Sequence, residues 1–144
     1  MFKLKVFMRL SEHHLGIVFI VLLTFSTYSY GQWTIYTNDD QKTIYVDPST
    51  IRRDGNFVEF WDIHNYKFPS IEVDGSKVSS TKGRRRYDCK NELQRTLFFT
   101  MYEGERGTGR VLGVQNYINE KPDWSPIIPD SPNMIIFKRV CSKK

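Results

Sequence analysis

The chain has 144 residues, 21 Lys and Arg against 16 Asp and Glu, and a formal net charge of +5 at pH 7. Three of the basic residues lie in the first nine positions, so the surplus over the rest of the chain is mild. A mild surplus allows attraction to acidic partners but falls short of the strongly basic surface typical of nucleic-acid binding proteins.

The first 31 residues have the layout of a secretory signal peptide, which also argues against nucleic acid as a partner. Three basic residues precede an uncharged apolar run at 15–25, and Ser29 and Gly31 place small residues at positions −3 and −1 of a cut before Gln32. The run is too short to span a bilayer comfortably, and no second such run follows. We therefore expect an exported single domain at 32–144 with no membrane span after signal cleavage.

The two cysteines of the sequence, Cys89 and Cys141, are expected to form a disulfide. An exported chain meets oxidising conditions, in which an even number of thiols usually pairs. Closing a loop of this length stabilises a fold by roughly 4 kcal/mol in the chain-entropy model. A chain this short buries only a modest core, so such a covalent link is useful.

The first half of the predicted domain consists of strands. β-Branched and aromatic residues predict short strands at 33–36 and 43–46. The run 53–56 is the strongest hairpin signal, because its Asp-Gly pair supplies positive φ angles. The strand that follows, 57–63, has apolar residues on both faces, so we expect it to be central and covered.

The second half continues as strands separated by turns. Several turn residues predict a long surface loop at 64–80, with a short strand at most. A basic strand at 81–88 leads to the first cysteine. Alternating apolar residues then predict a strand at 95–102, three glycines predict a turn at 103–109, and the chain returns as a strand at 110–117.

The C-terminal segment differs from the rest and predicts a helix. Ser131 is a suitable N-cap, and Pro132 is suited to the first helical position. Four residues of 132–141 fall on one helical face, namely Met134, Phe137, Val140 and Cys141. Adjacent isoleucines break strand alternation, so a helix is favoured over a strand, which is the alternative.

The candidate binding site is a basic cluster of Lys82, Arg84, Arg85 and Arg86. On a strand, Arg84 and Arg86 share one face and Arg85 takes the other. Two arginines on one face can hold sulfate or carboxylate groups through paired hydrogen bonds. The alternative is that the charges flank an edge strand and discourage edge-to-edge pairing.

No set of catalytic or metal-binding residues can be assembled with convincing spacing. His64 is the only histidine after residue 31, so a zinc site would need Cys or carboxylate ligands beside it, and both cysteines are expected in the disulfide. A nucleophile pair of Cys89 and His64, oriented by Asp88, would need a free thiol. The glycines of 107–113 lack the spacing and context of a dinucleotide loop. We therefore expect no enzyme, no metal and no cofactor.

Aromatic residues are abundant, with 3 Trp, 8 Tyr and 10 Phe. They invite a carbohydrate-binding interpretation, but aromatics also dominate small cores because each buries a large area. Trp61 lies in the predicted central strand and is expected in the core. Trp124 precedes a proline-bounded segment and is the better candidate for the surface.

Several short motifs together resemble the surface-adhesin E family of bacterial envelope proteins. The run 45–51 (YVDPSTI), followed by Gly55 and Trp61, is similar to the first half of that family. The second half continues with Tyr87-Asp88-Cys89, then 124–129 (WSPIIP) with Ser131, and finally Val140-Cys141.

The resemblance implies an α+β fold, with a curved antiparallel sheet of about six strands, a C-terminal helix on its concave face and one disulfide. The founding adhesin is a surface lipoprotein that binds host matrix and serum proteins. By this resemblance we expect a non-catalytic binding module whose partner is an extracellular or envelope protein. The positive charge of the basic cluster also allows a polyanionic glycan as the partner.

One departure from the family's pattern supports a second hypothesis. No cysteine stands at the predicted cleavage site, where the residue is Gln32, so nothing accepts a lipid at the predicted mature N-terminus. The alternative is therefore a periplasmic structural or accessory protein without an adhesive role. An unpaired edge strand would also allow a homodimer that extends the sheet.

Overall fold

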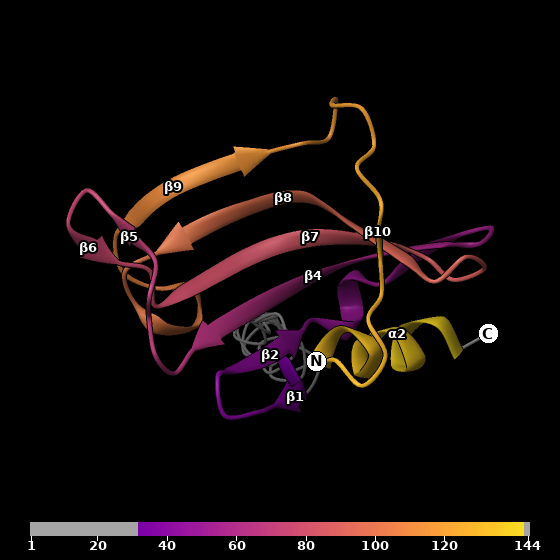
Figure 1. Ribbon diagram of the computed structural model, residues 1–144, viewed down its shortest axis with the longest axis horizontal. Coiled ribbons are helices and arrows are strands. Elements are labelled where there is room, and N and C mark those ends of the chain that lie inside the picture. Colours follow the sequence, from indigo (N-terminus) through magenta and orange to yellow (C-terminus); the bar gives the residue numbers. More distant parts are fainter. Residues whose placement is uncertain (1–31, 143–144) are drawn as a thin grey trace, which may run out of the picture. The chain divides into compact units, whose positions relative to one another are not determined.

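The structure is a computed structural model that describes residues 32–142, so the predicted signal peptide lies outside the described residues. The described residues form a large antiparallel sheet with a helix beside it, and a separate two-stranded hairpin (Figure 1). The sheet contains β1 (Thr34–Asn38), β2 (Lys42–Val46), β3 (Arg52–Asp54), β4 (Phe57–Tyr66), β7 (Ser80–Asp88), β8 (Leu93–Tyr102), β9 (Val111–Asn116) and β10 (Ser125–Pro126). Helix α2 spans Pro132–Ser142, and short 3-10 turns lie at η1 (Pro48–Thr50) and η2 (Glu105–Gly107).

The strand order is β1-β2-β4-β7-β8-β10, with β3 beside β4 and β9 beside β8. The predicted fold of a curved antiparallel sheet with one C-terminal helix is confirmed. Within residues 32–142 the sheet has eight strands, whereas about six were expected. The two additional strands are the short segments β3 and β10, of 3 and 2 residues. No helix of this region is long and apolar enough to cross a membrane.

The segment 64–80 differs from the predicted surface loop. Strand β4 continues to Tyr66, and β7 already begins at Ser80. Between them, the two-residue strands β5 (Glu72–Val73) and β6 (Ser76–Lys77) form a small hairpin. Asp74 and Gly75 at its turn have φ angles of 48° and 75°, the conformation that tight hairpin turns require.

Strands β4 and β7 form the centre of the sheet and set the faces of all the others. Residues 57–65 pair with residues 80–88 in antiparallel register. Val58 and Tyr87 are opposite each other on the face toward α2, whereas Trp61 and Arg84 are opposite each other on the far face. A shift of one residue would exchange the two faces, so the buried residues specify the register.

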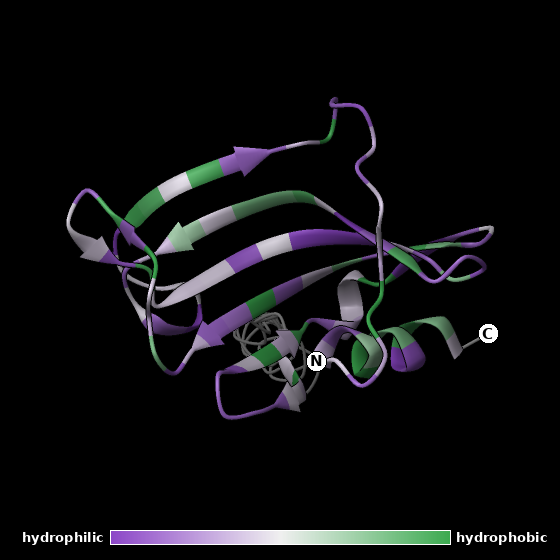
Figure 2. Ribbon diagram, viewed as in Figure 1, coloured by the Kyte–Doolittle hydropathy of each residue, from purple (hydrophilic) through white to green (hydrophobic). Residues whose placement is uncertain are grey.

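The hydrophobic core lies between the sheet and α2. Ten buried residues form it: Tyr36, Ile44, Val46, Val58, Phe60, Tyr87, Ile127, Ile136, Phe137 and Val140. The rings of Phe60 and Tyr87 meet edge to face with centroids 5.0 Å apart. Figure 2 shows that β7 is mostly hydrophilic, whereas α2 carries hydrophobic residues. The predicted helix is confirmed, and Met134 N donates to the Ser131 hydroxyl at 3.3 Å, as expected of an N-cap.

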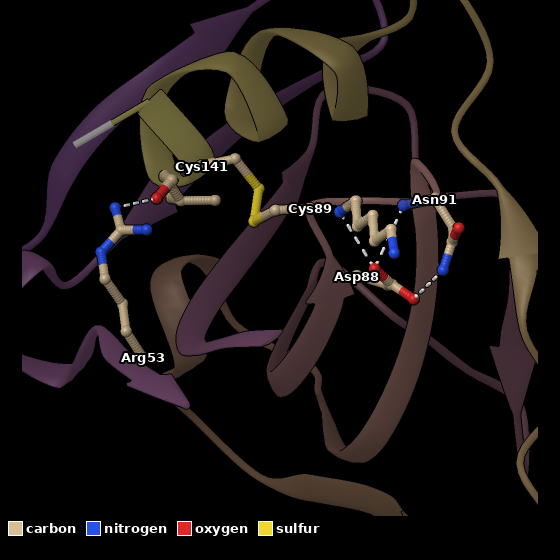
Figure 3. The surroundings of a disulfide bond; sticks show 7 residues. Arg53, Asp88, Cys89, Asn91 and Cys141 are labelled. Carbon is tan, nitrogen blue, oxygen red and sulfur yellow. Dashed lines mark hydrogen bonds between the residues drawn. A yellow bond between two sulfur atoms is a disulfide. The ribbon is translucent and has the colours of Figure 1, made fainter. Parts of the chain in front are cut away.

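The disulfide between Cys89 and Cys141 fastens α2 to the end of β7 (Figure 3). Its two Cα atoms are 5.6 Å apart and 52 positions apart in sequence. Arg53 donates a hydrogen bond to the carbonyl oxygen of Val140 beside it. On the other side, Asp88 accepts from the backbone nitrogens of Lys90 and Asn91 at 3.0 and 3.1 Å, which fixes the turn after the first cysteine.

A buried cluster of three polar and charged side chains, Asp62, His64 and Arg85, lies on the α2 side of the sheet, next to the apolar core. The Asp62 side chain is only 2% exposed, and His64 Nε2 donates to its Oδ2 at 3.0 Å. Arg85 Nε donates to the same oxygen at 2.9 Å. Gly83 is opposite Asp62, and a Cβ there would lie 2.9 Å from the Phe98 carbonyl oxygen. The close approach of β8 to β7 therefore favours glycine at this position.

The environment of this cluster shifts the pKa of both its titrating groups downward. Burial alone would raise the pKa of Asp62, but the charge of Arg85 and the hydrogen bonds from His64 and Arg85 outweigh it and leave the pKa below its ordinary value. Burial lowers the pKa of His64, and Asp62 opposes this effect only in part. The folded protein therefore holds an ionised Asp62 and a neutral His64 near pH 7.

The buried histidine predicts that the protein becomes less stable between about pH 7.5 and about pH 5.5. The unfolded chain takes up a proton near the ordinary pKa of 6.5, whereas folded His64 stays neutral. The unfolded state therefore binds more protons, and the free energy of unfolding decreases by up to about 1.4 kcal/mol for each pH unit below that value. Urea unfolding measured across this range would show the decrease.

His64→Gln is the matched variant, because the glutamine amide can still donate to Asp62 and does not titrate. Its free energy of unfolding should change much less over the same pH range. A variant with the same pH slope as the unmodified chain would show that His64 is not the group responsible.

Candidate functional site

The face of the sheet opposite α2, here called the open face, carries three of the four predicted site residues. Lys82, Arg84 and Arg86 alternate along β7 on this face, as the sequence predicted for the two arginines. Half-buried aromatic and acidic residues of β4 and β8 surround them, namely Phe57, Glu59, Trp61 and Phe98. Trp61, Arg84 and Phe98 stand in one row across the three strands.

One carboxylate on the open face is shared by two arginines. Glu59 forms an ion pair with Arg84, and its Oε1 lies 3.6 Å from Arg86 Nε. The side chains of Arg84 and Arg86 are 42% and 31% exposed, so both remain within reach of solvent. Because a single negative charge faces two positive ones, the group keeps a net positive charge. Ion pairs this exposed contribute little to stability.

Aromatic rings hold the cationic side chains of the open face in place. The guanidinium carbon of Arg86 lies 4.5 Å from the Phe57 ring centroid, and Lys82 Nζ lies 5.1 Å from that of Trp33. The ring of Trp61 meets that of Phe98 with centroids 5.9 Å apart. Contacts of this kind restrict long side chains without removing their charge.

Two hollows adjoin Trp61, and together they form a trough on the open face. One has a volume of about 240 Å³ and is lined by residues that include Arg52 and Arg84. The other has a volume of about 230 Å³ and is lined by residues that include Trp33 and Lys82. Trp61 and Thr50 line both. Thr50 is held there because its hydroxyl accepts a hydrogen bond from Trp61 N at 3.0 Å.

The fourth predicted residue, Arg85, does not belong to this site. It points to the opposite face, where it donates to Asp62 and, through Nη1, to the Thr96 hydroxyl at 2.6 Å. The basic cluster is therefore divided between two faces, as alternation predicted.

Two interpretations from the sequence are wrong. The basic strand is not at an edge, because β7 lies between β4 and β8. The charges thus do not protect a sheet edge; they are accommodated by Glu59 and Asp62 on the neighbouring strand. Trp61 is also not part of the core, since it is half-buried on the open face.

Sequence reasoning missed the role of Glu59, Trp33 and Phe98 in this site. Glu59 alternates with Phe57 and Trp61, which was a signal for a face with mixed charged and aromatic residues. The pairing with Arg84 depends on the β4–β7 register, which one strand alone does not reveal. Trp33 reaches Lys82 from before β1, far away in sequence.

Within residues 32–142, the side chains of the open face are suited to binding a partner, and no catalytic set is apparent among them. Both cysteines form the disulfide, and no group of three His, Cys, Asp or Glu side chains suited to a metal comes together within 32–142. The buried His64 contacts Asp62 and Arg85 but lines neither of the two hollows beside Trp61. The open face presents cationic, aromatic and hydrogen-bonding surfaces instead.

The fold is similar to solved structures of protein E from Haemophilus influenzae. One such structure has a TM-score of 0.54 and 15% sequence identity, over 81% of this chain and 88% of that chain. Protein E from non-typeable Haemophilus influenzae matches with the same TM-score and identity, over 81% of this chain and 79% of that one. A second crystal form gives a TM-score of 0.52 with 16% identity, over 69% of this chain and 80% of the other.

A search among curated proteins found no match. The family model described as surface-adhesin protein E matches residues 33–142, which is nearly all of the chain after the predicted signal peptide. The same residues hold the sheet, α2 and the Cys89–Cys141 disulfide. The chain therefore belongs to the surface-adhesin protein E family and is an adhesin-like protein.

Proposed function

We propose that residues 32–144 form one exported, non-catalytic domain that binds an extracellular or envelope protein through its open face. The trough around Trp61, bordered by Arg84, is the observation that most supports this proposal. Tryptophan, tyrosine and arginine account for most of the binding energy at protein interfaces, particularly where they line well-packed hollows. The cation–aromatic contacts also restrict these side chains before binding, which reduces the entropy lost in a complex.

A protein partner fits the open face better than a polyanionic glycan. Glu59 lies between Arg84 and Arg86, so an evenly negative chain would meet a carboxylate at the centre of the site. Like charges at an interface are costly and suppress the wrong partner. A protein surface can instead place an acidic group on the arginines and a donor on Glu59.

The test is binding to immobilised serum proteins and to a solubilised basement-membrane extract, measured by biolayer interferometry. We expect the double variant Arg84→Ser with Arg86→Ser to lose at least about tenfold in affinity for the bound component, because both forked donors are removed. Arg84→Lys with Arg86→Lys should lose nearly as much, since lysine keeps the charge but not the planar geometry. Lysine variants that bind normally and are displaced by heparin would indicate a polyanion site instead.

The matched control is Lys90→Ser with Lys138→Ser, which removes the same charge from exposed positions outside the open face. Its affinity should equal that of the unmodified chain. Thermal unfolding of every variant separates loss of binding from loss of fold. If the arginine double variant and this control bound the partner with equal affinity, the open face would not be the binding site.

The cellular location follows from the same proposal. An adhesin must be displayed outside the cell, whereas the periplasmic accessory protein of the alternative hypothesis need not be. We expect protease added to intact cells of the native bacterium to digest the protein. Protection until the outer membrane is opened would instead support the periplasmic alternative.

A further inference from the structure

A larger hollow lies at the outer edge of β8, between β9 and β10. Strand β9 pairs with residues 98–102 of β8, and β10 pairs with Leu93 and Gln94. The chain between β9 and β10 leaves the sheet as a loop, at the top of Figure 1. A cleft of about 390 Å³ forms there, and its lining includes Arg85, Gln94 and Asn133. Its volume falls within the range of small-molecule sites, about 300–1,000 Å³.

Arg85 is a fixed cation in the lining of this cleft. Its Nε donates to Asp62 and its Nη1 to Thr96, while Nη2 lies 3.4 Å from His64 Nε2. One fifth of its side chain remains exposed. A guanidinium held in this way is already ordered when a ligand arrives, so little rotational entropy is lost on binding.

Arg95 adds a second guanidinium to the lining of the cleft. Its Nη2 donates to the carbonyl oxygen of Tyr117 at 2.9 Å, and its guanidinium carbon lies 5.9 Å from the Trp124 ring centroid. Its Nε is buried and has no hydrogen-bond partner among residues 32–142. Arg95 is opposite Arg86 in the register of β7 and β8, so it lines the cleft from the open-face side.

The remaining lining is polar and carries both signs of charge. Lys121 is a third cation, and Glu120 and Asp123 are acidic residues of the same loop. Asn133 at the start of α2 donates to the side-chain oxygen of Gln94 at 2.9 Å, so these two amides form a connected pair. An apolar ligand would leave these groups unpaired, and a bare anion would not use the carboxylates.

We propose that this cleft binds a carboxylated sugar. The ligand carboxylate accepts hydrogen bonds from the Arg85 guanidinium on the α2 side of β8, a geometry that arginine favours, and Arg95 donates to another ligand oxygen from the open-face side. Sugar hydroxyls both donate and accept, so they pair with the amides of Gln94 and Asn133 and with the acidic loop residues. The cleft shares no lining residue with the trough around Trp61 and does not depend on the function proposed for the open face.

The experiment titrates the purified chain with methyl glucuronide, N-acetylneuraminic acid and a uronate-containing tetrasaccharide, and detects binding by saturation-transfer NMR. Methyl glucoside and sodium sulfate are the comparison ligands. We expect at least one carboxylated sugar to bind at least about tenfold more tightly than both, because only it satisfies the arginines and the hydroxyl-binding groups together. Equal binding of sulfate and the sugar, or no binding of any carboxylated sugar, would overturn the proposal.

Two variants locate the site. Arg95→Gln removes the guanidinium and should weaken sugar binding at least about tenfold. Lys121→Ser lies on the exposed loop, so it should weaken binding while leaving the thermal unfolding curve unchanged. Lys138→Ser on the exposed side of α2 removes the same charge elsewhere and should leave sugar binding unaltered. Full sugar binding by both Arg95→Gln and Lys121→Ser would place the ligand outside this cleft.

Discussion

The antiparallel register of β4 and β7 is the constraint on which the rest of the structure depends. Residues 57–65 and 80–88 carry apolar, aromatic and charged side chains in alternation, so one register sends Val58 and Tyr87 to the core. The same register sends Trp61 and Arg84 to the open face. A slip by one residue would bury the arginines that are exposed and expose the core, which explains why so polar a strand can occupy the centre of the sheet.

This register also gives three consecutive arginines two different roles. Arg84 and Arg86 share Glu59 and stay partly exposed, so they can exchange their partner for a ligand at little cost. Arg85 instead neutralises the buried Asp62, and its removal would leave an unpaired charge beside the core. The disulfide supports the arrangement from outside, because it holds α2 against the face on which Arg85 lies.

Local signals allowed much of this fold to be predicted. Ser131-Pro132 and helical spacing predicted α2, and alternation placed Arg84 and Arg86 together. The sequence did not predict that β4 continues through His64, because a polar residue is usually exposed. His64 is buried here because it contacts Asp62 and Arg85, and Arg85 comes from the neighbouring strand. A bulge in β8 opposite Arg84 and Arg85 interrupts alternation, and no single strand reveals it. The cleft beside β8 is lined by residues of β7, β8, β10, α2 and the loop between β9 and β10, so only the folded chain brings its lining together.

The division of the arginines is tested most directly by the free energy of unfolding of three single variants, measured by urea denaturation at pH 7.5. Arg85→Ser is predicted to lose about 3–5 kcal/mol, because Asp62 is left buried without its cation. Arg84→Ser and Arg86→Ser should each lose only about 0–1 kcal/mol, as expected of exposed pairs. Equal losses for all three variants would contradict the assignment of Arg85 to the fold and of Arg84 and Arg86 to recognition.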